Sequence, residues 1–176
     1  SRRSPKEDKE VPVTAAQVKE LRDKTGAGIM DSKRALEEAD GDLAKAESLL
    51  NEKGLASAAK KAGRSTSEGL VVSYIHTGGR VGSLVELNCE TDFVARTDEF
   101  EALGRNLAMQ VAAMSPIHVD RESVPEGEDV KDEQLLLEQE YIRDSSIKVA
   151  ELVKETIGKL GENIRIKRFS RFELGG

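Results

Sequence analysis

The feature that most constrains the fold is a change of hydrophobic period within residues 84–100, LVELNCETDFVARTDEF. From Val85 onward apolar and polar side chains alternate, which predicts a strand with one buried face. The alternation stops at residues 91–94. A helix is then predicted to begin near Thr97 or Asp98, because both are good N-caps and a glutamate follows three residues after the second, as in a capping box. The chain must therefore join a strand to a helix through a short junction.

The junction places an aromatic ring beside a carboxylate, in the order Thr91, Asp92, Phe93 and Val94. Loops between regular elements often present functional groups. Two interpretations stay open for these residues. Either Phe93 turns inward and fills the core, with Asp92 as a local turn-former, or the pair is presented to another molecule. Spacing alone favours the first, because large aromatic side chains are usually buried.

The segment NCETDFVAR at residues 88–96 resembles the core motif of the elongation factor Ts family, the guanine-nucleotide exchange factors of bacterial and organellar translation. Four further segments resemble the family in the same order: VKELRDKTGAGIMDSKRAL, KKAGR, SEGLV and GENIRIKRF. The resemblance implies that Asp92 and Phe93 reach into elongation factor Tu, which favours the presented ring. It also implies an α+β fold, with an N-terminal three-helix domain of the ubiquitin-associated type. A core domain follows, with a three-stranded antiparallel sheet backed by helices.

The N-terminal third of the sequence divides into three parts. Residues 1–12 are charged and lack periodicity, which predicts a disordered lead-in. Residues 13–54 predict three short helices, which are stable only when packed on one another. The predicted N-caps are Thr14, Asp31 and Asp42, and the predicted ends are Gly26, the Asp40-Gly41 pair and Gly54. Residues 55–68 are rich in small, basic and polar side chains and predict a linker with some helical content.

Ile29 and Met30 are adjacent apolar residues in the predicted turn between the first two helices. They either close the small core of this domain or form an exposed contact for a partner. Methionine suits adaptable binding surfaces, and the resemblance implies that this domain grips elongation factor Tu. Ile29 and Met30 are therefore predicted to be a secondary partner contact. The glycines around them lack the spacing and the Lys-Ser/Thr pair of a phosphate loop.

Residues 69–176 are predicted to form the core domain. The tetrapeptide TGGR at residues 77–80 predicts a tight hairpin turn, because glycine allows positive φ. The other predicted elements are strands at 70–76 and 81–89, an apolar helix ending before Pro116, a short helix at 134–142, a helix from Ser146 to Gly161, and a third strand at 163–172.

Composition argues against several classes of function. The net charge is −6, only 3% of residues are aromatic and there is no tryptophan, which disfavours base-stacking and general nucleic-acid binding. His76, His118 and Cys89 are too scattered for a metal site. Cys89 lies on the apolar face of its predicted strand, so we expect a buried filler and not a nucleophile. No apolar run predicts a membrane span. We expect no enzymatic activity, no cofactor and no metal.

The sequence therefore predicts a binding protein that acts by conformational change. The resemblance implies a guanine-nucleotide exchange factor for elongation factor Tu, which inserts residues 91–94 and disturbs the Mg/phosphate site. The alternative is a ribosome-associated or RNA-contacting accessory protein, suggested by the charged lead-in and by the basic last strand. That strand carries Arg165, Lys167, Arg168 and Arg171.

Oligomeric state and compartment stay open. Long family members carry two core repeats and this chain carries one, so a noncovalent homodimer and a monomer are both possible. Ser170 stands where some short relatives have a cysteine, which removes that route to a covalent dimer. The family carries a helical insertion that is nearly absent around residues 115–134 of this chain. We therefore do not expect this chain to make the contacts of that insertion. The likeness of residues 67–82 to cyanobacterial and plastid relatives favours the chloroplast stroma over the bacterial cytoplasm.

Overall fold

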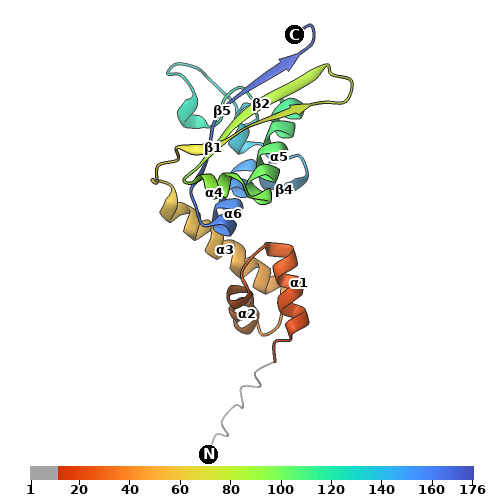
Figure 1. Ribbon diagram of the computed structural model, residues 1–176. Coiled ribbons are helices and arrows are strands. Elements are labelled where there is room, and N and C mark those ends of the chain that lie inside the picture. Colours follow the sequence, from red (N-terminus) through yellow and green to blue (C-terminus); the bar gives the residue numbers. More distant parts are fainter. Residues whose placement is uncertain (1–11) are drawn as a thin grey trace, which may run out of the picture. The chain divides into compact units, whose positions relative to one another are not determined.

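The computed structural model describes residues 12–176. The predicted lead-in at residues 1–12 lies outside the described residues, apart from Pro12. The chain divides into two compact units, Ser1–Gly54 and Leu55–Gly176 (Figure 1). None of the helices within residues 12–176 is long and apolar enough to span a membrane.

The first unit contains α1 (Ala15–Thr25), α2 (Ile29–Glu38) and the beginning of α3 (Leu43–Lys61). As predicted, Thr14 caps α1, in a capping box with Gln17, and α1 ends at Gly26, which has a φ of 69°. The small core of this unit consists of Leu21, Ala35, Leu36, Ala39 and Ala46.

Two helix boundaries in this region were predicted wrongly. Helix α2 begins at Ile29 with Gly28 as its N-cap, and Asp31 lies within the first turn. A carboxylate in the first turn is favoured by the helix dipole even without capping, which explains why Asp31 was mistaken for the cap. Helix α3 does not end at Gly54 but continues to Lys61. The alanine-rich sequence after Gly54 has high helix propensity, which offsets the cost of one glycine, about 1 kcal/mol.

The second unit is built on a three-stranded antiparallel sheet, as predicted, and the order of its strands is β1-β2-β5. The strands are β1 (Glu68–Ile75), β2 (Val81–Cys89) and β5 (Ile164–Glu173). Gly78 and Gly79 take positive φ in the turn between β1 and β2. Helix α5 (Asp98–Met114) packs on β1 and β2, and α6 (Val149–Leu160) packs on β5 (Figure 1). The fold is therefore α+β, with a sheet backed by helices.

The segment between α5 and α6 differs from the prediction. Residues 134–142 form no α-helix, only one complete 3-10 turn and the start of a hairpin, and α6 begins at Val149 instead of Ser146. The observed elements are three 3-10 turns, η1 (Arg121–Ser123), η2 (Asp132–Gln134) and η3 (Leu136–Glu138), and a small hairpin of β3 (Glu140–Tyr141) and β4 (Asp144–Lys148). The buried side chain of Gln110 donates to the Glu140 carbonyl (3.0 Å) and accepts from the Ile142 amide (2.8 Å). These tertiary hydrogen bonds favour the hairpin over a local helix.

Candidate partner-binding site

The junction after β2 folds into one helical turn, α4 (Asp92–Ala95). The Thr91 hydroxyl caps this turn by accepting a hydrogen bond from the Val94 amide (3.4 Å). Thr97 caps α5 in the same way, accepting from the Phe100 amide (3.2 Å), as predicted. The short helix itself was not predicted. Its signal is present in the sequence, since a threonine followed by an acidic residue is typical of a helix start.

The ring of Phe93 projects into solvent, with 76% of the residue exposed. The interpretation that Phe93 fills the core is therefore wrong. Phe100, the next aromatic residue, is fully buried and occupies that place. Asp92 is also exposed, whereas Val94 is half-buried and packs against the core. The turn thus presents one carboxylate and one ring, and anchors itself through its remaining side chains.

Arg96 joins this exposed pair and was missed by the sequence analysis. Its guanidinium forms an ion pair with the Asp92 carboxylate, and its Nε donates to the Asp92 carbonyl (3.3 Å). The same guanidinium carbon lies 5.7 Å from the centre of the Phe93 ring. The i,i+4 spacing of Asp92 and Arg96 was the available signal. Arg96 therefore restrains both exposed groups of the turn.

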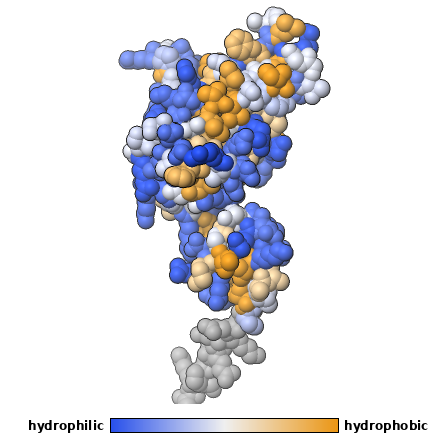
Figure 2. All heavy atoms as spheres, in the orientation of Figure 1, coloured by the Kyte–Doolittle hydropathy of each residue, from blue (hydrophilic) through white to orange (hydrophobic). Residues whose placement is uncertain are grey.

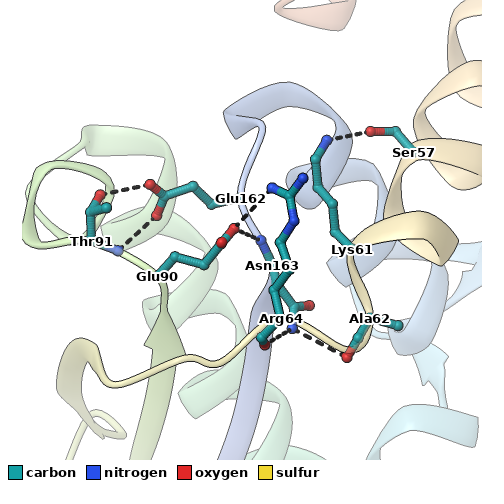
Figure 3. A network of polar contacts seen from close by, with 8 residues as sticks. All are labelled: Ser57, Lys61, Ala62, Arg64, Glu90, Thr91, Glu162 and Asn163. Atoms are coloured by element: carbon teal, nitrogen blue, oxygen red, sulfur yellow. Dashed lines mark hydrogen bonds and ion pairs between the residues drawn. The ribbon is translucent and has the colours of Figure 1, made fainter.

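Three hydrogen bonds hold Thr91, the residue that caps the turn. Its amide donates to Glu162 Oε1 (2.9 Å), and its hydroxyl donates to Glu162 Oε2 (2.7 Å) (Figure 3). Its carbonyl accepts from the thiol of Cys89 (3.1 Å). Burial, and next the negative charge of Glu162, raise the pKa of the Cys89 thiol to about 11. The thiol therefore remains a protonated donor at neutral pH, and as predicted it is buried.

A second set of contacts connects the same junction to the segment after α3 (Figure 3). Glu90 accepts from the Asn163 amide (2.7 Å) and lies 3.6 Å from the Arg64 guanidinium. The Asn163 side chain donates to the carbonyls of Arg64 (2.8 Å) and Ala62 (3.4 Å). Glu162 and Asn163 lie about 70 residues beyond the junction in sequence, so no local pattern could have predicted these contacts.

Ile29 and Met30 lie in the first unit, in the first turn of α2, and both are exposed (57% and 60%). The interpretation that they close the small core is therefore wrong. Gly28, the N-cap of α2, provides no side-chain hydrogen bond. These two residues are thus exposed apolar groups on a helix end that lacks a side-chain cap.

The groups weighed for other chemistry are dispersed or already paired. Within residues 12–176 no group of three or more His, Cys, Asp and Glu side chains is placed to hold a metal ion. His76 contacts the Tyr74 hydroxyl (2.9 Å) and His118 contacts Glu128 (3.0 Å). In the basic strand β5, Arg168 pairs with Glu86 (2.9 Å) and Arg171 with Glu173 (3.1 Å). These pairs weaken the case for an RNA-binding strand.

Comparisons with known proteins identify sequence relatives of this chain. The family model described as Elongation factor TS matches residues 37–134. Elongation factor Ts of Carboxydothermus hydrogenoformans is 50% identical over 194 residues, covering 93% of this chain and 89% of that protein. Elongation factor Ts of Rippkaea orientalis is 48% identical over 195 residues, and the alignment covers 93% of this chain and 78% of that protein. Both alignments are longer than the 176 residues of this chain, so these relatives contain residues that it lacks.

Proposed function

Because this chain belongs to the elongation factor Ts family, we propose that it accelerates GDP release from elongation factor Tu by presenting the ring of Phe93. Membership of the family makes it a nucleotide exchange factor in translation elongation and implies elongation factor Tu as its partner. Such a factor releases a bound nucleotide and catalyses no covalent reaction. One observation supports Phe93 as the acting group: its ring is exposed on a turn whose backbone is held in place.

The free energies indicate that Phe93 needs help from a wider interface. A factor that binds the nucleotide-free GTPase more tightly than the GDP form weakens GDP binding by the same coupling free energy. A thousandfold faster release corresponds to about 4 kcal/mol, at about 1.4 kcal/mol per decade. Burial of one aromatic side chain contributes about 1.5–3 kcal/mol. The remainder must come from other contacts, and we propose Thr91, Asp92, Val94, Ile29 and Met30 for this role.

The proposed mechanism divides the work between the two exposed groups of α4. The Phe93 ring inserts between helices of the GTPase domain, as the family implies. Asp92 then disturbs the groups that hold Mg²⁺ and the phosphates. Once Mg²⁺ loses its ligand geometry, the β-phosphate of GDP loses much of its neutralising charge and is held less tightly.

The test measures release of fluorescent GDP from elongation factor Tu, with and without the chain. The wild-type chain should accelerate release, and Phe93→Ala should lower the maximal rate about tenfold to a hundredfold, in line with the burial free energy of one ring. Ile117→Ala is the control, because Ile117 is also largely exposed (56%) but lies outside the Phe93 turn. An equal loss in both variants would contradict the assignment to Phe93.

The rival function is tested in the same preparation. An RNA-contacting accessory protein would leave GDP release unchanged and bind RNA with an affinity that falls steeply with salt. The pairing of Arg168 and Arg171 with carboxylates argues against this function.

For the place of action we propose the chloroplast stroma or the bacterial cytoplasm. The likeness of residues 67–82 to cyanobacterial and plastid relatives favours the stroma, which a fluorescent fusion would test.

A noncovalent homodimer is a further proposal, supported by the outer face of the sheet. Ile75, Gly82 and Phe172 form one row across the three strands, and Ile75 and Phe172 are largely exposed. Val71 and Leu84 extend this apolar face along β1 and β2. Figure 2 shows hydrophobic residues gathered over the part of the second unit that contains the sheet. Sedimentation at working concentration should detect a dimer that Ile75→Asp abolishes; a monomeric wild-type chain would refute it.

A further inference from the structure

The turn between α6 and β5 contacts two segments that are distant from it in sequence (Figure 3). Helix α6 ends at Gly161 with a φ of 76°, and Glu162 and Asn163 follow before β5 begins. Glu162 contacts the cap of α4, and Asn163 contacts the chain after α3. Neither Glu162 nor Asn163 takes part in the proposed mechanism of the Phe93 turn.

The contact between Glu162 and Thr91 uses both oxygens of the carboxylate. One oxygen accepts from the Thr91 amide (2.9 Å) and the other from the Thr91 hydroxyl (2.7 Å). Because the hydroxyl proton is donated to Glu162, the hydroxyl oxygen is free to accept from the Val94 amide and cap α4. Hydrogen bonds to a charged acceptor are about twice as strong as neutral ones. Glu162 therefore fixes the rotamer of the residue that starts the turn.

Asn163 fixes the position from which Glu162 acts. It is buried, its amide donates to Glu90 (2.7 Å), and its side chain donates to the Arg64 carbonyl (2.8 Å). Glu90 directly precedes Thr91. The turn between α6 and β5 is therefore hydrogen-bonded to two consecutive residues of the junction, through Asn163 and Glu162. The carboxylate of Glu162 is thus held against Thr91 on a supported backbone.

We propose that Glu162 is a positioning residue for nucleotide exchange. Through Thr91 and α4 it sets the direction in which the Phe93 ring projects toward the partner. This proposal rests on the proposed role of Phe93. Glu162 lies outside the hydrophobic core of the second unit and is only half-buried, so its loss should alter the turn more than the stability of the fold.

The first experiment measures GDP release from elongation factor Tu at a series of concentrations of Glu162→Gln. The maximal rate should fall about tenfold, because even small misplacement of a positioned group is costly, while the half-saturating concentration should change less than about twofold. Glu138→Gln is the matched control, since the Glu138 carboxylate also forms a polar contact, with Lys148 (3.0 Å), but lies outside the junction. Thermal unfolding of each variant reports whether the fold is intact.

A double-mutant cycle separates positioning from a general structural effect. In the Phe93→Ala background Glu162→Gln should cause no further loss of rate, because the ring that it positions is gone. Thr91→Val removes the hydroxyl that donates to Glu162 and should reproduce the loss of rate seen in the Glu162→Gln variant. If Glu162→Gln costs the same in both backgrounds, or costs nothing, the positioning role is overturned. A wild-type chain without any exchange activity would instead overturn the proposed function itself.

Discussion

The two exposed apolar sites of the chain differ in how firmly the backbone beneath them is held. Phe93 lies on α4, whose cap Thr91 has hydrogen bonds from its amide, hydroxyl and carbonyl. Ile29 and Met30 lie on the first turn of α2, whose N-cap Gly28 makes no side-chain hydrogen bond. A pre-organised group loses less conformational entropy on binding. The comparison suggests a rigid site for insertion and an adaptable site for grip.

The largest expected contrast between the sites is in amide hydrogen exchange. The Thr91 amide is bonded to a carboxylate, whereas the Met30 amide is among the first N–H groups of a helix, which have no intrahelical partner. We expect exchange at Thr91 to be slower by about a thousandfold or more, as for amides that exchange only through local opening. Two-dimensional NMR in deuterated buffer measures both amides in one sample. Similar rates would remove the distinction between a rigid and an adaptable site.

The second contrast is in pH dependence, because only the Phe93 turn has a buried titratable anchor. The native pKa of the Cys89 thiol is raised to about 11 by burial, so above about pH 9 the unfolded chain releases this proton and the native chain retains it. The free energy of unfolding should then fall by up to about 1.4 kcal/mol per pH unit until about pH 11. Urea unfolding at pH 8 to 11 measures this, and Cys89→Ala should lack that part of the slope. Parallel slopes for both proteins would contradict the thiol's role.

Elements with a local signal were predictable from the sequence. The alternation of Val85, Leu87 and Cys89 identified β2, and all three are buried. Caps at Thr97 and Gly161 placed the start of α5 and the end of α6. In each case neighbouring residues contain the whole signal, either as a period or as a backbone preference at one position.

Features that depend on distant residues were not predictable. The hairpin of β3 and β4 is held by Gln110, about 30 residues earlier, and the sequence there suggested a helix. Glu162 holds Thr91 across about 70 residues, and nothing in either segment indicates the other. The exposure of Phe93 is a third case, since its spacing favoured burial and only the resemblance to a family reversed that expectation.

The third prediction concerns the adaptable site. The double variant Ile29→Ser, Met30→Ser should raise the half-saturating concentration for GDP release about tenfold and leave the maximal rate unchanged. Two half-exposed side chains that lose their contacts correspond to roughly 1–2 kcal/mol of binding. Ile117→Ser is the control, because Ile117 is equally exposed (56%) but lies outside both sites. A fall in the maximal rate would mean that this site takes part in insertion and not only in grip.

The smallest expected effect tests whether Arg96 contributes to the rigidity of the Phe93 turn. Arg96 binds Asp92 and lies over the Phe93 ring, but both contacts are exposed to solvent. Exposed ion pairs contribute about 0.2–1 kcal/mol and exposed cation–π contacts about 0.5–1 kcal/mol. Arg96→Gln should therefore slow GDP release about twofold to fivefold at low salt and less at high salt, where screening has already weakened the pair. Arg105→Gln removes a similar i,i+4 pair on α5 and should have no effect. A loss as large as that of Phe93→Ala would mean that Arg96 itself contacts the partner, and the turn would then present three groups instead of two.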